Sequence, residues 1–242
     1  MPLKYFQIIV LALVFGLQYL FEHLFPQDRK HNNWKNEKFN IAIGVLNLIL
    51  SLVPSGLLVT CLDVIQQKNF GLLNQWHLPF FIKTIFVIII TDLWMYAWHR
   101  LNHTLPFLWQ FHIFHHKDEH MNSTTALRFH FLELLLSYPG KALVCFLFGI
   151  DYVALLIYEI LFFLSVVIHH SNIYITEKAD NTYRLFFVSP KMHRIHHSIR
   201  KEETHSNFGA LFSFWDKLFS SWRKQSNGTI IFGVIDDSKK GQ

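Results

Sequence analysis

Charged residues are scarce in this chain of 242 residues. Asp, Glu, Lys and Arg make up 16% of the sequence, against roughly 25% in ordinary soluble proteins. Hydrophobic residues make up 51%. This composition is typical of a membrane protein. The formal charge of +5 comes from basic residues scattered over several loops. No basic stripe with interleaved aromatic residues is present, which argues against a nucleic-acid partner.

Cysteine is also rare, and several signature motifs are missing. Cys61 and Cys145 lie far apart in or beside apolar segments without a C-x-x-C motif, so we expect buried, reduced thiols rather than metal ligands. The sequence contains no G-x-S-x-G, P-loop or G-x-G-x-x-G motif. It also lacks the H-E-x-x-H motif of zinc proteases and the pair of E-x-x-H motifs that soluble di-iron bundles use.

Long apolar segments account for much of the chain. Five are long enough to cross or enter a bilayer, so we expect an all-α, multi-pass transmembrane bundle of about four to five spans. The segments lie at residues 5–25, 39–62, 79–98, 131–150 and 152–168. Pro54 and Gly56 should kink or break the second segment. Only Gly-Ile-Asp at 149–151 separates the last two segments, which predicts a tight helical hairpin, either fully spanning or re-entrant.

The distribution of Lys and Arg predicts the orientation of this bundle. The loop at 27–38 carries four basic residues, whereas the loop at 63–77 carries one. The positive-inside rule therefore predicts a cytoplasmic first loop and an N-terminus on the outside. The third span then delivers His99 to the cytoplasm, and residues 171–242 stay on that side. We expect every histidine cluster to lie in a helical cap on the cytoplasmic side of the membrane.

Histidine, in contrast, is abundant and clustered. An H-x-x-x-H motif at 99–103 is followed by H-x-x-H-H motifs at 112–116 and 193–197, and by an adjacent pair at 169–170. Residues three and four apart share a helical face, so the histidines of one motif can point to one side. Neutral imidazole is the commonest metal ligand. Four clusters exceed what one tetrahedral zinc needs, which indicates two metal ions with open coordination positions.

Other polar residues near the clusters are candidates to support the ligands. A liganding histidine usually donates its second N–H to a carboxylate or a carbonyl. The possible carboxylate partners are Asp92, Asp118, Glu119 and Glu133. The remaining isolated histidines share no helical face with another histidine and are not expected to bind metal; they are His23, His31, His77 and His205.

Six segments of this sequence together resemble the fatty acid hydroxylase/sterol desaturase superfamily. They are H-R-x-x-H (99–103), W-Q-F-H-I-F-H-H (109–116), M-N-S-T-T-A-L-R-F-H (121–130), H-H-S-N (169–172), P-K-M-H-R-I-H-H-S (190–198) and N-F-G…F-W-D-K-L-F (207–219). The resemblance predicts N-terminal membrane spans and loops at 1–84, a catalytic domain at 85–223 and a polar C-terminal tail at 224–242.

The resemblance also implies a set of ligands by motif position. These are His99, His103, His112, His115, His116, His169, His193, His196 and His197. His169 is expected rather than its neighbour His170, and Ser165 stands where some family members have a further histidine. His120 and His130 are expected to support the ligands from outside. The aromatic residues expected to line a lipid slot are Trp94, Trp98, Phe107 and Trp109.

Members of the superfamily are membrane enzymes with a histidine-ligated dimetal centre, taken to be di-iron. They use O2 and two electrons to hydroxylate or desaturate a C–H bond of a lipid. The resemblance implies the same activity here, with two iron ions, O2 as co-substrate and a sterol or fatty-acyl type substrate. No fused electron-donor domain is visible, so we expect an external donor, a ferredoxin or a cytochrome with its reductase.

The residues alone leave two other functions open. One is a membrane hydrolase that uses zinc-bound water, and the other is a metal transporter or sensor. A transporter should carry histidines inside its spans along a path, whereas these clusters lie beyond the span ends, which argues against transport.

Overall fold

A computed structural model describes residues 3–235, which fold into helices and loops without a β-strand in that range. The long helices are α1 (Leu3–Leu24), α2 (Trp34–Leu50), α3 (Leu52–Gln67), α4 (Phe80–Thr104), α5 (Pro106–His116), α6 (Phe131–Phe148) and α7 (Tyr152–His170). The short ones are α8 (Glu177–Tyr183), α9 (Pro190–His196), α10 (Lys201–Thr204), α11 (Phe214–Leu218) and the 3-10 turns η1 (Arg29–His31), η2 (Leu72–Asn74) and η3 (Ser123–Leu127). The predicted tail at 224–242 lies partly outside the described residues.

Several of these helices have the length and apolar character of membrane spans. Helices α1, α4, α6 and α7 qualify singly, and α2 with α3 forms a fifth candidate that is bent by 46°. These helices confirm the predicted all-α, multi-pass fold of four to five spans. The break falls at Ser51, and Pro54 lies in the first turn of α3, where a missing N–H costs no hydrogen bond within the helix.

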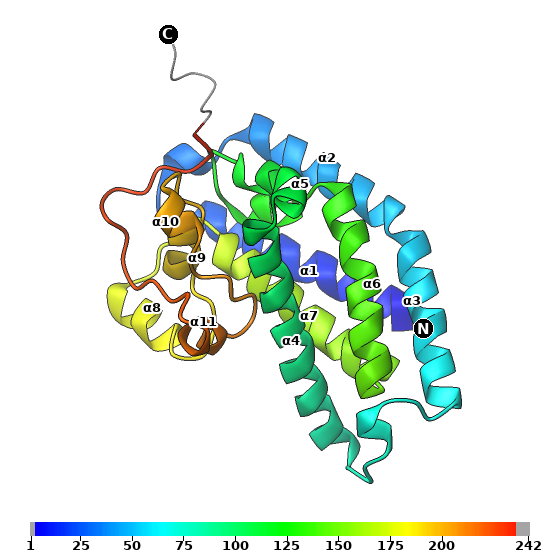
Figure 1. Ribbon diagram of the computed structural model, residues 1–242. Coiled ribbons are helices and arrows are strands. Elements are labelled where there is room, and N and C mark those ends of the chain that lie inside the picture. Colours follow the sequence, from blue (N-terminus) through cyan, green and yellow to red (C-terminus); the bar gives the residue numbers. More distant parts are fainter. Residues whose placement is uncertain (1–2, 236–242) are drawn as a thin grey trace.

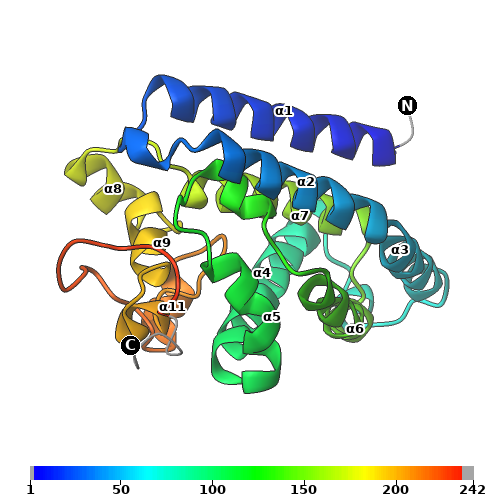
Figure 2. The same cartoon turned by 90° about the horizontal axis from the view of Figure 1, so that it is seen from above.

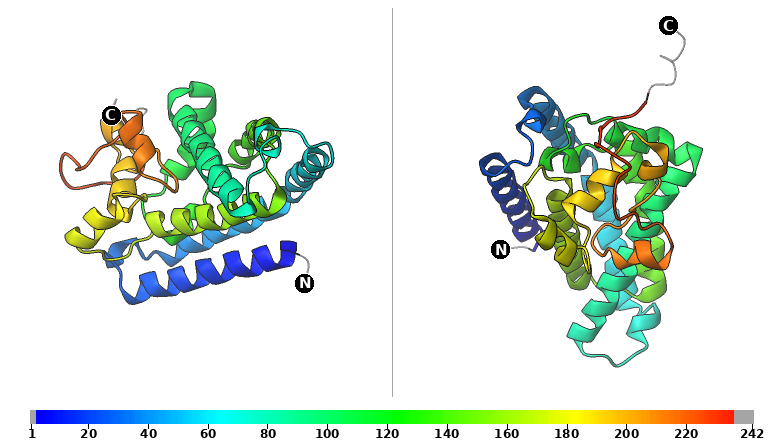
Figure 3. Two further views of the ribbon diagram at one scale, coloured as in Figure 1. Left: turned by 90° about the horizontal axis from the view of Figure 1, so that it is seen from below. Right: turned by 90° about the vertical axis from the view of Figure 1, so that its left-hand side faces the viewer.

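Helices α4 and α7 form the centre of the bundle. Figure 1 shows α7 crossing behind α4, and α6 beside α4. Helix α1 lies along the outside of the molecule against α7, as Figures 2 and 3 show. Its contact with α2 includes a hydrogen bond of 2.7 Å from the Tyr19 hydroxyl to Glu37. Histidines lie near the C-terminal end of α4 and at the C-terminal end of α7, so the central pair carries two of the four clusters to one end of the bundle.

The predicted hairpin between α6 and α7 is present and has a three-residue connection. Gly149 ends α6 in the left-handed region, with φ of 70°, and Asp151 caps α7 through the amide of Ala154. A Cβ on Gly71 would lie 2.0 Å from the backbone nitrogen of Gly149, so this close approach of two loops requires glycine. Farther along the hairpin, Lys141 of α6 forms an ion pair of 2.8 Å with Glu159 of α7.

The short helices α8–α11 gather at one side of the bundle, drawn in yellow to orange in Figure 1. We call them, with their loops, the cap. Asp92 in α4 attaches the cap to the bundle, because its buried carboxylate accepts the backbone N–H groups of Leu211 and Phe212 and the indole N–H of Trp215. It also accepts the hydroxyl of Tyr158 in α7. Asp92 therefore fixes the cap, and does not support a histidine as the sequence suggested.

The ion pair in the hairpin gives a first prediction. Lys141→Met should leave Glu159 charged and unpaired between two apolar helices, and lower the free energy of unfolding by about 2 kcal/mol. The neutral double variant Lys141→Met/Glu159→Gln should recover most of this loss. Thermal denaturation in detergent measures both, with the exposed Lys178→Met as a control. Equal losses for the single and the double variant would show that the pair does not couple the helices.

Candidate metal centre

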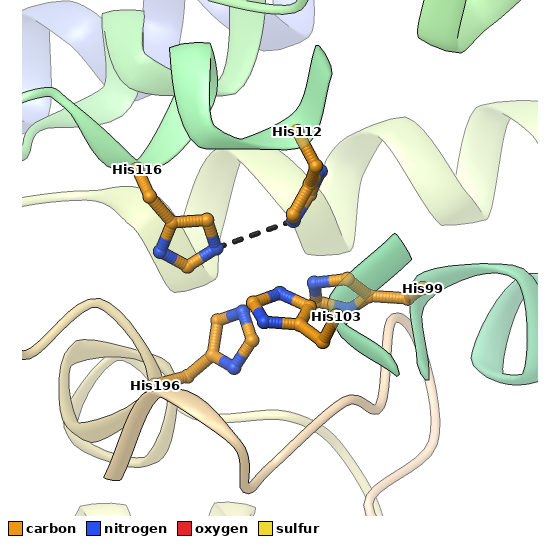
Figure 4. A group of neighbouring side chains, drawn as sticks. All are labelled: His99, His103, His112, His116 and His196. Atoms are coloured by element: carbon orange, nitrogen blue, oxygen red, sulfur yellow. Dashed lines mark hydrogen bonds between the residues drawn. The ribbon is translucent and has the colours of Figure 1, made fainter. Parts of the chain in front are cut away.

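Nine buried or partly buried histidines converge in two groups between the bundle and the cap. Within each group the nitrogens that could bind metal all lie within 4.8 Å of one another. Group A consists of His99, His103, His112, His116 and His196. Group B consists of His115, His170, His193 and His197. Figure 4 shows the rings of group A, which come from α4, α5 and α9 and point toward one another. Eight of the nine predicted ligands belong to these groups.

Each H-x-x-H-H motif supplies both groups. In α5, His112 and His116 enter group A while His115 enters group B. At the end of α9 the pattern is reversed, because the first and last histidines of the motif enter group B and His196 enters group A. His115 and His116 are adjacent in the chain, as are His196 and His197, and adjacent residues of a helix point about 100° apart. The prediction that all histidines of one motif point one way is corrected accordingly.

Hydrogen bonds at the outer nitrogen orient five of the nine rings. The Nδ1 acceptors are Phe208 O for His99 (2.9 Å), Arg128 O for His115 (3.2 Å), Val166 O for His170 (2.7 Å), Ser206 O for His196 (2.7 Å) and the Glu133 carboxylate for His112 (2.8 Å). A carbonyl oxygen only accepts, so Nδ1 carries the proton in these rings. Their Nε2 atoms are therefore left with lone pairs directed into the groups.

This placement of protons makes lone pairs face each other in group B. The Nε2 atoms of His115 and His170 lie 3.0 Å apart, although both rings donate from Nδ1 to a carbonyl. The Nε2 atom of His193 lies 3.0 Å from that of His170. The Nε2 lone pairs of His115 and His170 repel each other and cannot form a hydrogen bond. A cation between them removes the repulsion, so the donor set fits a metal ion.

Burial keeps the rings neutral and leaves several nitrogens without a partner. It lowers the pKa of His116, His196 and His197 well below the ordinary value of 6.5, and repulsion from neighbouring imidazoles acts in the same direction. Buried ring nitrogens without a hydrogen bond occur in His103, His116, His193, His196 and His197. Buried polar atoms are rarely left unpaired in proteins. Neutral imidazole is a good metal ligand, so both groups could hold an ion.

The pair at the end of α7 differs from the sequence prediction. His170, and not the predicted His169, lies in group B. The carbonyl of Val166 accepts from His170 Nδ1 and directs its Nε2 toward His115. His169 packs beside His193 with 4.0 Å between ring centroids. Adjacent residues in a helix point about 100° apart, and the motif alone does not reveal which of the two faces α5.

Of the four predicted carboxylate partners, Glu133 is the one that contacts a group histidine in the described part of the chain. It accepts from His112 Nδ1 at 2.8 Å. Asp118 instead accepts amides from α2 and so fixes that helix over the site. Asp92 fixes the cap, and Glu119 is exposed. The prediction of a carboxylate–histidine contact thus holds at one position.

Neither His120 nor His130 supports a ligand as predicted. His130 accepts the backbone N–H of Leu132 and caps the start of α6. His120 makes a hydrogen bond of 3.0 Å with Asn33. The isolated histidines His23, His31, His77 and His205 also lie outside both groups.

Some residues that hold the site carried no recognisable signal beyond the family resemblance. Asn207, in the left-handed region with φ of 57°, donates to the carbonyls of Met192 and Arg223. Asp216 accepts the N–H groups of Phe208 and Gly209. Together they fix the turn that presents the Phe208 carbonyl to His99. The stretch at 207–219 therefore acts through the backbone, which a sequence pattern does not display.

An apolar cavity adjoins both groups. Its walls include His99 and His112 from group A, His115, His170 and His193 from group B, and the side chains of Met95, Trp98, Phe129, Phe162, Val166 and Ala210. Of the four aromatic residues predicted to line a lipid slot, Trp98 alone borders this cavity. Trp94 packs on Gly140, Phe107 is 61% exposed, and Trp109 lies against the outer side of group A.

A family model described as "Fatty acid hydroxylase" matches residues 84–221. The chain belongs to the fatty acid hydroxylase family. The match spans more than half of the chain and contains every histidine of groups A and B. It confirms the resemblance and the predicted class of enzyme, an oxygen-dependent oxidoreductase. With the apolar helices it also supports an integral membrane protein.

Relatives of the chain carry related names. The ornithine lipid hydroxylase OlsE of Rhizobium tropici is 26% identical over 92% of this chain and 68% of its own length. The alkylglycerol monooxygenase of Caenorhabditis elegans is 26% identical over 78% of this chain and 39% of its own length. The human alkylglycerol monooxygenase is 27% identical over 81% of this chain and 42% of its own length. The chain thus spans about two fifths of those two monooxygenases. No solved structure matches.

The two neighbouring histidines of α7 give a second prediction. His170→Ala removes an Nε2 that faces two other rings of group B, so it should abolish metal binding in that group. His169→Ala should retain most of the metal, because His169 lies outside the group. Metal content per chain after purification measures both. Loss of metal in His169→Ala, with metal retained in His170→Ala, would instead identify His169 as the ligand.

Proposed function

We propose that this protein is a membrane lipid hydroxylase that inserts one oxygen atom of O2 into a C–H bond of an acyl or alkyl chain. The observation that carries the proposal is the apolar cavity bordered by histidines of both groups. A hydrocarbon segment in this cavity would lie beside two sites able to hold metal. Such placement of a substrate beside its reactive centre is a main source of enzymatic rate enhancement.

We propose iron as the metal, with one ion held by group A and one by group B. When bound, the two ions would supply the reduction of O2 and the oxidation of the C–H bond. The overall reaction consumes the lipid, O2, two electrons and two protons, and gives the hydroxylated lipid and water. The family, and the imidazole character of both groups, support this assignment.

The residues of the chain supply position, dryness and shape. Phe162 and Val166 of α7 and Met95 of α4 give the cavity apolar walls, which favour a hydrocarbon and exclude water. Glu133 also borders the cavity, and it holds His112 in one tautomer through its Oε1. Its Oε2 is buried without a partner, so it is available to accept a proton or a polar group of the substrate.

The names of the relatives support a lipid with a polar head group and long chains as the substrate class. Ornithine lipid and alkylglycerol are the substrates that these names print. A fatty-acyl substrate, which the family resemblance implied, belongs to the same proposal, whereas the sterol that the resemblance also implied is a different class of lipid. Lipid analysis of cells with and without the gene would identify the compound. The zinc hydrolase alternative is not favoured, because neither the family nor the named relatives are hydrolases.

The metal assignment gives a third prediction. Protein expressed with iron and without added zinc should hold two irons per chain and form an O2-dependent lipid product. His196→Ala and His193→Ala should each lower the iron content and abolish the product, because each removes a donor from one group. His77→Ala, on an exposed loop, should change neither. Full activity at a stoichiometry of one iron per chain would contradict the dimetal proposal.

We also propose that groups A and B lie on the cytoplasmic side, with the N-terminus outside. The four basic residues at 27–38 support this orientation, and η1 in that loop carries Arg29 and Lys30. Reporter fusions inserted at 27–38 and attached after residue 242 should both score cytoplasmic. Opposite scores would mean that the number of spans between them is not the expected one.

A further inference from the structure

The proposed function requires electrons to reach two deeply buried groups. Apart from His99, every histidine of groups A and B is at most 3% exposed. An external donor therefore cannot touch these buried ligands, and His99 borders the apolar cavity, so each electron has to cross a layer of protein. This inference rests on the proposed function and concerns where an electron crosses the layer.

Trp109 of α5 bridges this layer beside group A. Its ring centroid lies 5.0 Å from that of His103 and 5.5 Å from that of His116. The ring is half-buried, and the exposed ring of His205 lies 6.4 Å away. Other aromatic rings touch group A in the described residues, but Phe208 is buried and Phe129 borders the substrate cavity. Trp109 and His205 are thus the aromatic contacts of group A that face outward.

A surface groove of about 640 Å³ lies over these two rings. Its lining includes Ile113 and Ile199, and it shares no residue with the apolar substrate cavity. A partner in the groove would therefore not obstruct the lipid. Among the described residues, group B has no aromatic contact that faces outward. The rings beside it belong to histidines of the two groups, to the buried His169 and to Phe129, which borders the substrate cavity.

The charge around the groove is mainly positive. Arg200, Lys201 and the acidic Glu202 line the groove. Arg223 and Lys224 line a depression beside it, which Glu202 also borders. Arg200 is paired with Glu203. Lys201 and Lys224 are exposed and make no ion pair in the part of the chain that the structure describes. Such a rim favours a partner with a negative surface.

We propose that an acidic one-electron carrier protein docks over this groove and that Trp109 conducts its electrons to group A. Each docking event would deliver one electron and release the carrier in its oxidised form. Two such events, by two reduced carriers or by one carrier that is reduced again in between, would supply two electrons. These two electrons, with two protons, balance the reduction of one oxygen atom of O2 to water while the other enters the lipid. Group A would receive the electrons first. Group B would receive them from group A through the two H-x-x-H-H motifs, which contribute histidines to both groups.

The docking surface is tested by equilibrium binding to the iron-loaded protein without lipid substrate, so the result does not depend on activity. An acidic ferredoxin is titrated against wild type, against Lys201→Glu/Lys224→Glu, and against the matched control Lys68→Glu/Lys178→Glu, whose lysines are exposed elsewhere. The groove variant should bind about tenfold more weakly and with less dependence on salt. The control should bind like wild type. Equal weakening of both variants, or of neither, would overturn the docking surface.

The role of Trp109 is tested by the rate at which reduced ferredoxin reduces the iron-loaded protein. Trp109→Leu should lose most of this rate, whereas Trp109→Phe, which keeps a ring, should retain most of it. Both Trp109 variants should keep the wild-type iron content and the wild-type rate of reduction by dithionite. The control variant Trp76→Leu should be reduced by ferredoxin at the wild-type rate. A wild-type rate in Trp109→Leu, or an equal loss with both reductants, would overturn the conducting role. Failure of the proposed function would appear separately, as the absence of lipid product from wild type with either reductant.

Discussion

Repulsion between facing imidazole lone pairs is the constraint on which this structure depends. In group B, His115 and His170 both donate outward from Nδ1 and present unprotonated Nε2 atoms to each other at 3.0 Å. Burial prevents the rings from taking up a proton to relieve the contact. A cation that shared these lone pairs would remove the repulsion and stabilise the folded arrangement of this region.

The surrounding architecture places the outer acceptors. Backbone carbonyls of Val166, Ser206 and Phe208 hold three of the rings, and two of these carbonyls belong to the cap. The cap in turn is fixed by Asp92, whose carboxylate is saturated by donors from three segments. A substitution in α4 far from any ligand can therefore disturb the site, because it releases the carbonyls that orient the histidines.

The apolar segments predicted the four to five spans and the hairpin, and the histidine motifs, with the family resemblance, predicted eight of the nine grouped histidines. The choice between His169 and His170 could not be made, since it depends on how α7 is rotated against α5. The roles of Asp92 and Asp118 were also missed. A buried carboxylate near a histidine cluster has the same appearance in a sequence whether it accepts an imidazole or a backbone amide. Carbonyl acceptors such as Ser206 have no sequence signature at all.

The reversed use of the two H-x-x-H-H motifs has a consequence for how the centre assembles. Because α5 and α9 each contribute to both groups, an ion in one group fixes the two helices that the other group also needs. A first ion would then bear the entropy cost of ordering both helices, and a second would bind to a site already formed. Loading should be cooperative, so that a preparation with half its metal contains mainly empty and fully loaded molecules. A motif arrangement that kept each helix to one group would allow the sites to fill independently.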